Sequence, residues 1–214
     1  MKVLVVGANG QIGQKIVKQI QDSEEHSVVA MVRKNEQKEQ LEKEGIEAVL
    51  ANLEDSVDNL AKALSGADAV IFSAGSGGST GADKTLLIDL EGAIKMMEAS
   101  EQAGVDRFLI ISALGADKRE NWNEKIKSYY VAKYYADKVL EKSNLNYTII
   151  RPGALVNEPG TGNVWEGTEF EYGKIPREDV ARVAVTSLTA EQTYRKAFNL
   201  ISGDASIDEA IKRL

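Results

Sequence analysis

The sequence predicts an α/β fold in which helices cover both faces of a doubly wound parallel sheet of about seven strands. Short runs rich in β-branched residues alternate with longer stretches of helical periodicity along the whole chain. The strand-like runs are apolar throughout, which is typical of strands that are buried on both faces. No Pro/Ser-rich linker or change in composition divides the chain, so we expect residues 1–214 to form a single domain.

Seven apolar runs predict the strands, and they lie at 2–6, 27–32, 47–51, 68–73, 107–111, 146–151 and 197–201. The stretches between them carry apolar residues at helical spacing. Three such stripes consist of Ile12, Ile16, Val17 and Ile20, of Val57, Leu60, Ala61 and Leu64, and of Leu86, Leu87, Leu90, Ile94 and Met97. We assign each stripe to the face of a helix that packs on the sheet.

Two polar stretches interrupt this alternation, at 115–127 and 157–176, and each carries a single tryptophan, Trp122 or Trp165. Both follow the carboxyl ends of predicted strands, where open α/β sheets bind their ligands. Long loops at that edge are more often functional than structural. We expect small substrate loops that close over a ligand. The alternatives are a disordered surface loop for each stretch and a buried anchor for each tryptophan.

Composition excludes several kinds of chemistry. The 214 residues, 43% hydrophobic and 28% charged, suffice for one sizeable core. With no cysteine and one histidine, His26, we expect no disulfide, no thiol nucleophile and no metal site. A net charge of −7 without a Lys/Arg block argues against a nucleic-acid partner. No apolar stretch approaches the roughly 20 residues that span a membrane, so we expect a cytoplasmic protein without a membrane partner.

The motif GANGQIG, residues 7–13, follows the first predicted strand and opens the first predicted helix. Glycines let the backbone of such a turn approach a ligand, and the helix N-terminus offers free N–H groups to a pyrophosphate. The spacing of Gly7, Gly10 and Gly13 is GxxGxxG rather than GxGxxG, but its place at the first strand–helix junction predicts a Rossmann nucleotide site. We expect Asn9, Gln11 and Ile12 to contact the cofactor with these glycines.

The end of the second predicted strand indicates which nucleotide binds. An NAD-binding domain usually carries Asp or Glu there for the ribose 2′-hydroxyl. This chain has Arg33 followed by Lys34, and a guanidinium suits a phosphate through paired charge-assisted hydrogen bonds. The sequence therefore predicts NADP(H) as the preferred cofactor, with NAD(H) possible if Arg33 merely faces solvent.

Two tyrosine–lysine pairs follow each other on one predicted helix, in YYVAK (129–133) and YYADK (134–138). Residues four apart lie on the same helix face. A lysine ammonium beside a phenol lowers the pKa of the tyrosine, which can then exchange a proton with a substrate oxygen. Tyr129 and Tyr134 lie about 140° apart around the helix, so one face cannot serve both pairs.

At this point the chain resembles the short-chain dehydrogenase/reductase superfamily, which combines GxxGxxG with YxxxK and a serine after the fifth strand. The short length and the RPG sequence at 151–153 resemble its atypical single-domain branch, described as NAD(P)-binding or epimerase/dehydratase-like. The resemblance covers essentially the whole chain. It is specific for the superfamily but not for a substrate.

The resemblance implies which pair is catalytic. In the family the lysine tends to follow a small residue and to precede an acid by four positions, as Lys133 does with Ala132 and Asp137. It therefore implies that Tyr129 is the general acid or base, that Lys133 also holds the nicotinamide ribose, and that Tyr134 and Lys138 are ordinary helix surface or packing. Ser112 takes the place of the hydroxyl residue that binds the substrate carbonyl. Because the next residue is Ala113 where relatives often have a second hydroxyl, Ser112 could instead tie down the turn.

The resemblance also implies further cofactor contacts. Asn52 and Leu53 resemble the pair that contacts the adenine, and Ala74 and Gly75 resemble the small residues that line the cofactor. Pro152 and Gly153 resemble the segment beside the nicotinamide carboxamide. Small residues in turns explain most of these positions without a ligand.

Three functions agree with these features. The first is an NADP(H)-dependent oxidoreductase that transfers hydride to or from a small carbonyl or quinone-like substrate. The second is an NAD(P)-dependent epimerase or dehydratase acting on a sugar-like substrate, although little chain remains to build a nucleotide-sugar domain. The third is a non-catalytic NADP(H) redox sensor that binds a protein partner. We expect a monomer or a homodimer, and the family-level expectation for the dimer is contact through helices 84–102 and 123–142.

Overall fold

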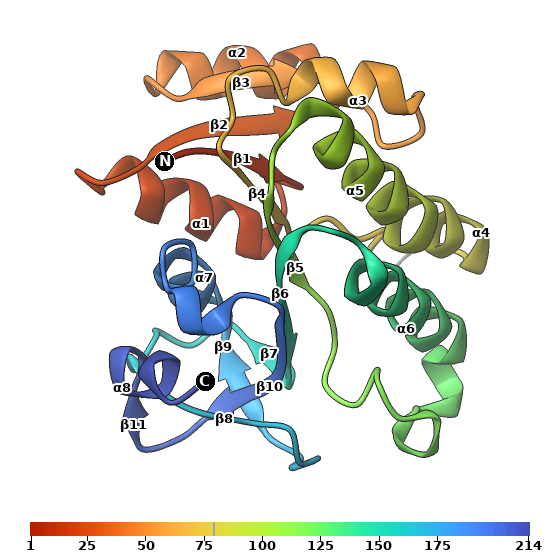
Figure 1. Ribbon diagram of the computed structural model, residues 1–214, viewed down its shortest axis with the longest axis vertical. Helices are drawn as coiled ribbons and strands as arrows, with labels where there is room; N and C mark the ends of the chain where they lie inside the picture. Colours follow the sequence, from red (N-terminus) through yellow and green to blue (C-terminus); the bar gives the residue numbers. More distant parts are fainter. Residues whose placement is uncertain (79) are drawn as a thin grey trace.

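The computed structural model describes residues 1–78 and 80–214, which form one α/β domain around a nine-stranded sheet (Figure 1). All seven predicted strands are present and run parallel to one another. They are β1 (Lys2–Val6), β2 (Ser27–Val32), β3 (Glu47–Leu50), β4 (Ala69–Phe72), β5 (Arg107–Ile111), β6 (Asn146–Pro152) and β10 (Lys196–Ser202). The predicted fold class is confirmed.

The sheet has more strands than predicted, because two further strands lie beyond β10. β8 (Asn163–Gly167) pairs antiparallel with β10, and β11 (Ala205–Ser206) pairs antiparallel with β8. A separate small sheet joins β7 (Ala154–Val156) to β9 (Lys174–Pro176). The polar stretch at 157–176 is therefore partly strand, and Trp165 lies opposite Ile201 in the sheet. Trp165 is an anchor of the sheet edge and not part of a loop.

The strand order β11-β8-β10-β6-β5-β4-β1-β2-β3 places a switch point between β1 and β4. From β1 the chain proceeds outward through β2 to β3, and it then crosses back to β4 on the other side of β1. In open α/β sheets, ligands bind outside the carboxyl ends of the strands at such a point. The loops after β1 and β4 therefore border the expected site.

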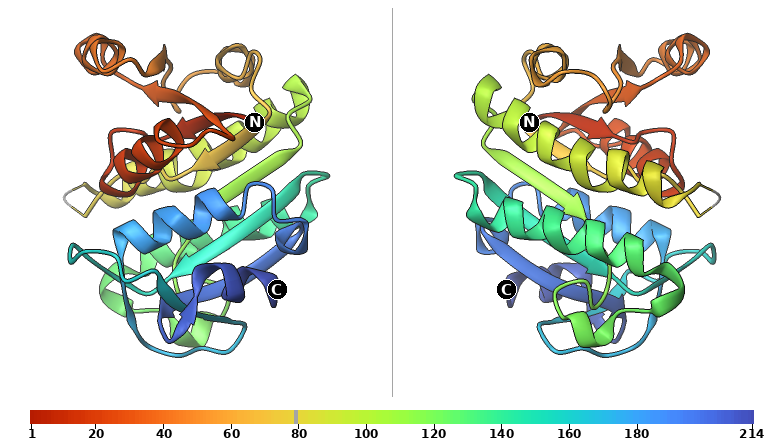
Figure 2. Two further views of the ribbon diagram at one scale, coloured as in Figure 1. Left: turned by 90° about the vertical axis from the view of Figure 1, so that its left-hand side faces the viewer. Right: turned by 90° about the vertical axis from the view of Figure 1, so that its right-hand side faces the viewer.

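Helices cover both faces of the sheet, as the two side views of Figure 2 show. α1 and α7 pack together on one face, whereas α3, α5, η1 and α6 pack on the other. The α-helices are α1 (Gln11–Gln21), α2 (Asn35–Lys43), α3 (Val57–Ala63), α4 (Ala82–Lys84), α5 (Gly92–Ala103), α6 (Lys127–Lys142), α7 (Arg177–Thr186) and α8 (Ile207–Lys212). The remaining helical segments are the π-helix η1 (Thr85–Glu91) and the 3₁₀-helices η2 (Arg119–Asn121), η3 (Glu124–Ile126) and η4 (Glu191–Thr193).

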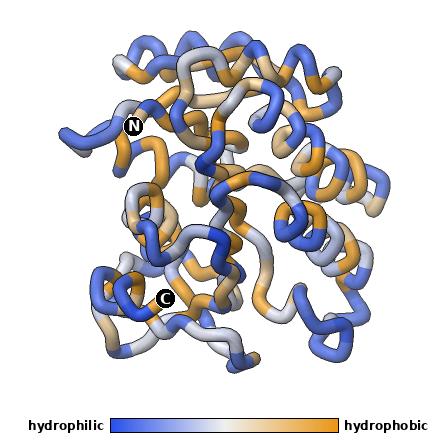
Figure 3. Tube along the Cα trace, viewed as in Figure 1, coloured by the Kyte–Doolittle hydropathy of each residue, from blue (hydrophilic) through white to orange (hydrophobic). Residues whose placement is uncertain are grey.

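The core consists of two apolar layers, one on each face of the sheet. Figure 3 shows the hydrophobic strands inside and the hydrophilic outer surfaces of the helices. The first two predicted helix stripes lie in or against these layers, but the third prediction is wrong at its beginning. Leu86 and Leu87 are 48% and 40% exposed. The cause is that η1 is a π-helix, whose wider turn changes which residues face inward.

A buried arginine at the amino end of β5 connects this strand to β6 and to the segment that follows α7. Arg107 is 3% exposed and donates hydrogen bonds to the carbonyl oxygens of Leu188 and Ser187, at 3.0 and 2.5 Å. It also donates to the hydroxyls of Thr148 and Thr193, at 2.8 and 3.0 Å. Burial lowers the pKa of the guanidinium to about 10, but the group satisfies several buried acceptors.

We expect Arg107→Met to destabilise the fold by about 3–5 kcal/mol, because it leaves these buried acceptors without donors. Chemical denaturation measures the loss. Arg213→Met, at an exposed arginine near the C-terminus, is the matched control and should change the stability by less than about 0.5 kcal/mol. Equal stability of the two variants would contradict a structural role for Arg107.

No helix in the described part of the chain is long and apolar enough to cross a bilayer. The same residues contain no group of three or more His, Cys, Asp or Glu that could hold a metal ion.

Candidate active site

The glycine motif forms a tight loop between β1 and α1, as predicted. Gly7 has a φ of 81°, a conformation that side chains rarely adopt, and its carbonyl oxygen accepts a hydrogen bond from Gly10 N at 2.9 Å. A Cβ on Gly13 would overlap the Gly7 carbonyl oxygen. Gly10 caps α1 without a side-chain hydrogen bond, which leaves N–H groups of the first turn available to an anion.

The loop after β4 lies directly against the glycine motif. A Cβ on Gly7 would stand 2.7 Å from the Ala74 Cα atom, so the two loops could not approach each other with a larger residue at position 7. Two residues further on, Ser76 N donates a hydrogen bond to the Asp89 carboxylate at 2.9 Å. The structure thus connects the glycine loop, through Ala74 and Ser76, to η1.

Tyr129 and Lys133 lie on the face of α6 that packs against η1. Lys133 is 3% exposed, and its ammonium donates a hydrogen bond to the Ile111 carbonyl oxygen at 3.2 Å, at the carboxyl end of β5. The same ammonium lies 3.4 Å from Asp89 Oδ1 and 5.6 Å from the centroid of the Tyr129 ring. Asp89 therefore links the loop after β4 to the predicted catalytic pair.

The electrostatics of Tyr129 differ from the prediction. Lys133 does lower the pKa of Tyr129, but burial has the larger effect, and Asp89, Tyr130 and Asp137 also act upward. The net pKa of the phenol is raised. For Lys133, burial acts downward, but Tyr129 and the carboxylates of Asp89 and Asp137 raise the pKa above its ordinary value. The resting site thus combines a protonated phenol with a charged ammonium.

The second tyrosine–lysine pair lies on the other side of α6. Arg119 stacks over the Tyr134 ring at 4.3 Å and donates to its hydroxyl at 3.2 Å. Lys138 forms an ion pair with Glu141 at 2.6 Å. Tyr134 is half-buried and also meets Trp122 edge to face at 5.6 Å. These contacts are consistent with the expectation that Tyr134 and Lys138 are ordinary helix surface or packing.

Ser112 lies beside Asp137, which is one further turn along the Tyr129–Lys133 stripe of α6. Its hydroxyl is buried and has no hydrogen-bond partner among the described residues, and the same is true of Asp137 Oδ1. Burial raises the pKa of Asp137, whereas Arg151 and Ser112 act in the opposite direction, so the hydroxyl is near the carboxylate without good hydrogen-bond geometry. The side chain does not hold the turn; only Ser112 N does so, through the Ile150 carbonyl oxygen at 2.7 Å.

The remaining predicted cofactor residues differ in exposure. Arg33 is exposed directly after β2 and is in none of the ion pairs found among the described residues. Asn52 is half-buried, and its side chain accepts a hydrogen bond from Glu54 N at 3.1 Å. Leu53 is 5% exposed and packs against Gly92, so its side chain belongs to the core. Asn9, Gln11 and Gly75 are exposed, Ile12 is buried, and Ala74 is half-buried.

The segment after β6 is held tightly in place. Pro152 is buried, and its carbonyl oxygen accepts a hydrogen bond from Leu114 N at 2.9 Å. A Cβ on Gly153 would overlap the Gly173 carbonyl oxygen. The segments from the two polar stretches also meet each other, because a Cβ on Gly115 would contact the Phe170 ring at 2.8 Å.

Aromatic side chains extend from Tyr129 along this surface. Tyr129 meets Tyr130 edge to face at 5.9 Å, and Tyr130 is parallel to Trp122 at 6.3 Å. Trp122 is half-buried and donates to the Ala116 carbonyl oxygen at 3.1 Å, so it is anchored beside the site rather than free to close over it. Tyr172 is 76% exposed.

Two charged residues of this region were missed by sequence reasoning. Asp89 lies within a predicted apolar helix stripe, and its position between Leu87 and Leu90 was the available signal. Arg151 forms ion pairs with Asp137, Glu141 and Asp117 at 2.9, 3.4 and 3.8 Å. Arg151 is the first residue of the RPG sequence, but no pattern in the neighbouring sequence indicated its carboxylate partners.

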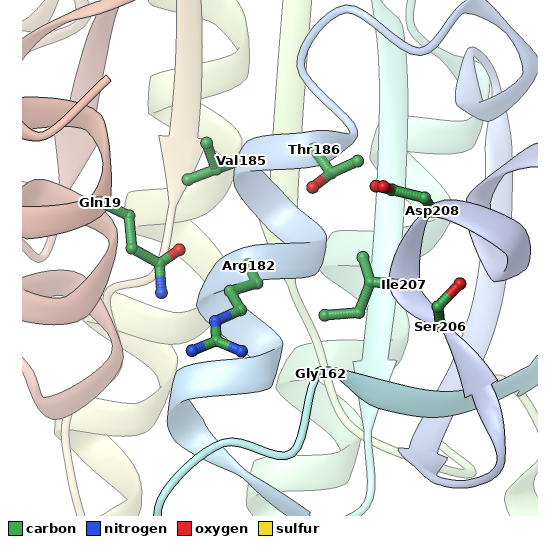
Figure 4. Close-up of a pocket in the computed structure, with 8 residues that line it drawn as sticks. All are labelled: Gln19, Gly162, Arg182, Val185, Thr186, Ser206, Ile207 and Asp208. Atoms are coloured by element: carbon green, nitrogen blue, oxygen red, sulfur yellow. The ribbon is translucent and has the colours of Figure 1, made fainter.

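A surface hollow of about 410 Å³ lies elsewhere, between α1, α7 and the start of α8 (Figure 4). It contains none of the predicted catalytic or cofactor-binding residues, although Gly162 of the 157–176 stretch lines it. Its arginine, Arg182, forms an ion pair with Glu178 at 2.7 Å. We assign no function to this hollow.

Comparison with known proteins identifies the family of this chain. The sequence profile of the NAD(P)H-binding family matches residues 7–191. A protein of Bacillus subtilis (strain 168) named uncharacterized sugar epimerase YhfK is 59% identical over 214 residues and covers 100% of both chains. The structure of a candidate NAD-dependent epimerase/dehydratase from Bacillus halodurans has a TM-score of 0.93 at 40% identity, covering 100% of both chains. That of the oxidoreductase ylbE from Lactococcus lactis has a TM-score of 0.90 at 32% identity, covering 100% of this chain and 96% of that chain.

The relatives are thus named as epimerases and oxidoreductases, and they match this chain along its whole length. The resemblance to the atypical short-chain dehydrogenase/reductases is confirmed, and the chain belongs to the NAD(P)H-binding family.

Proposed function

We propose that this protein is an NADP(H)-dependent oxidoreductase that uses Tyr129 as a proton donor to a small carbonyl or quinone-like substrate. One observation carries the proposal: an unbroken set of contacts joins the glycine loop to the Tyr129–Lys133 pair at the carboxyl edge of the sheet. The steps are Gly7 to Ala74, Ser76 to Asp89, and Asp89 to Lys133.

The residues at this edge fit a dinucleotide. A Cβ has no room at Gly7, where Ala74 blocks it, or at Gly13, where the Gly7 carbonyl oxygen blocks it. The first turn of α1, which begins after Gly10, offers N–H groups to a pyrophosphate. Arg33 is exposed at the end of β2, where the ribose of the adenosine half binds in this fold class. A guanidinium there favours a 2′-phosphate over a hydroxyl. When bound, the cofactor supplies or accepts a hydride.

The chain's own groups would handle the proton and the orientation of the substrate. Tyr129 donates the phenolic proton to the substrate oxygen as charge develops on that oxygen. Lys133, fixed by the Ile111 carbonyl oxygen, provides a nearby positive charge and a donor for ribose hydroxyls. Ser112 carries an unpartnered hydroxyl next to this stripe and is our candidate for orienting the carbonyl. Tyr130 and Trp122 offer flat apolar surface to the rest of the substrate.

A second candidate is an NAD(P)-dependent epimerase, because a relative that is 59% identical is named a sugar epimerase. An epimerase returns its nicotinamide to the starting state in each turnover, whereas a reductase consumes the reduced form. Net loss of NADPH absorbance with a substrate panel of carbonyl compounds, quinones and flavins would favour the oxidoreductase. Interconversion of two stereoisomers of a sugar-like substrate without any loss of NADPH absorbance would favour the epimerase.

The cofactor proposal is tested by titrating the protein with NADPH and NADH and following the cofactor fluorescence. We expect tighter binding of NADPH, and Arg33→Ser should raise its Kd by about 10- to 100-fold, as expected for the loss of charge-assisted hydrogen bonds. The Kd for NADH should change little, since NADH lacks the 2′-phosphate.

Arg213→Ser removes another exposed arginine, near the C-terminus, and is the matched control. Equal affinity for the two cofactors, or the same result for both variants, would contradict the role of Arg33. Binding without any turnover would instead favour the redox-sensor alternative.

A further inference from the structure

Asp89 is a buried carboxylate that the proposed chemistry does not require as a proton donor or acceptor. It is 1% exposed, and its two oxygens make different contacts. One accepts the Ser76 N–H at 2.9 Å, and the other lies 3.4 Å from the Lys133 ammonium. Burying a carboxylate costs several kcal/mol unless it is paired, so this placement requires a reason.

The backbone around Asp89 is unusual as well. Asp89 belongs to η1, a seven-residue π-helix that leads directly into α5. π-Helices are rare and often occur at functional sites. This one turns Leu86 and Leu87 outward, at 48% and 40% exposed, while Asp89 faces α6. A polar side chain thus occupies an inward position while leucines on the same segment are exposed.

Asp89 therefore lies between the cofactor loops and the Tyr129–Lys133 pair. It fixes the loop after β4, which touches the glycine motif through Ala74. It also holds the ammonium that lies over the Tyr129 ring. The groups that face Tyr129 and Lys133 are Tyr130 and Asp137 from α6, Asp89 from η1 and the Ile111 carbonyl oxygen from β5. Arg151 of β6 faces Asp137.

We propose that Asp89 is a positioning residue that holds the Lys133 ammonium against β5 and offsets its charge, so that Tyr129 serves as an acid. This inference rests on the proposed function and deepens it, because a site that retains its phenolic proton favours reduction of the substrate. Without Asp89, the ammonium would be free to move toward the phenol oxygen, where its positive charge would stabilise the phenolate and lower the pKa of Tyr129. The raised pKa of Tyr129, to which Asp89 contributes, agrees with this direction.

The test measures the titration of Tyr129 itself, without cofactor or substrate. The seven tyrosines are replaced by 3-fluorotyrosine, which titrates at lower pH, and the ¹⁹F NMR signal of Tyr129 is assigned by its loss in Tyr129→Phe. We expect Asp89→Asn to shift the Tyr129 midpoint to lower pH. Asn has the same shape and can still accept the Ser76 N–H, and unchanged signals from the other tyrosines verify the fold.

Two comparisons separate positioning from a general charge effect. Asp117→Asn removes another carboxylate of the region, one that lies 3.8 Å from Arg151, and it should leave the Tyr129 midpoint unchanged. In a Lys133→Gln background, Asp89→Asn should produce a smaller shift than in the natural chain, because there is no ammonium to release. An unchanged or raised midpoint in Asp89→Asn, or equal shifts in both backgrounds, would overturn the proposal.

Failure of the proposed function gives a different result. If the protein does not bind NADPH, the cofactor titration fails while the NMR titration can still succeed. If reductase activity is found, the alkaline limb of its pH profile should move to lower pH in Asp89→Asn.

Discussion

Tyr129→Phe is expected to lower kcat by about 10²- to 10⁴-fold, the usual contribution of a positioned general acid. Phenylalanine keeps the ring that lies beneath the Lys133 ammonium, so only the hydroxyl is lost. The Kd for NADPH should remain close to that of the natural protein, because the glycine loop and Arg33 are untouched. The measurement is steady-state turnover of the fastest substrate in the carbonyl, quinone and flavin panel, together with NADPH titration.

Tyr134→Phe is the matched control for this prediction. Tyr134 lies one residue after Lys133 and has the same i,i+4 relation to a lysine, but its hydroxyl contacts Arg119 on the surface. We expect turnover to be unchanged in this variant. Equal loss of turnover in the two variants would mean that α6 as a whole is sensitive to substitution. A larger loss in Tyr134→Phe would mean that Tyr134 and Lys138, and not Tyr129 and Lys133, are the catalytic pair.

The fold could be predicted because each strand of a parallel sheet has a recognisable pattern in its own local sequence. Each of the seven parallel strands is a short apolar run, since both of its faces are covered by helices. β8 and β11 carry no such signal. The sequence of β8, NVWEG, contains two polar residues and a glycine, and β8 pairs with residues of β10 that lie more than thirty positions away. Long-range antiparallel additions of this kind are set by tertiary contacts rather than by the local pattern.

The site could be predicted only in part, for a related reason. The glycine loop and the Tyr129–Lys133 pair are spacing patterns within one turn or one helix, so the sequence alone located them. Asp89 and Arg151 act through partners on other elements. In addition, the helical periodicity that assigned Leu86 and Leu87 to the core assumed 3.6 residues per turn. A π-helix breaks that assumption, and it does so at the residue that contacts Lys133.

Gly13→Ala should abolish measurable NADPH binding. The added Cβ would overlap the Gly7 carbonyl oxygen and stand 2.9 Å from Ala8 Cα, so either α1 or the loop must move. Both atoms belong to the backbone, which cannot rotate away as a flexible side chain could. Such overpacking typically costs about 1–3 kcal/mol of stability, which a fold of this size can tolerate while the loop geometry is lost.

Thermal unfolding with and without NADPH separates the two consequences. A ligand at about 100 times its Kd stabilises the native state by about 2.7 kcal/mol, so the natural protein should show a clear rise in Tm. Gly13→Ala should start from a lower Tm and gain nothing from NADPH. Lys18→Ala, at an exposed position of the same helix, should retain both the starting Tm and the gain. A full gain in Gly13→Ala would mean that the cofactor does not depend on the close packing of this loop, and the binding site would have to be sought elsewhere on the sheet edge.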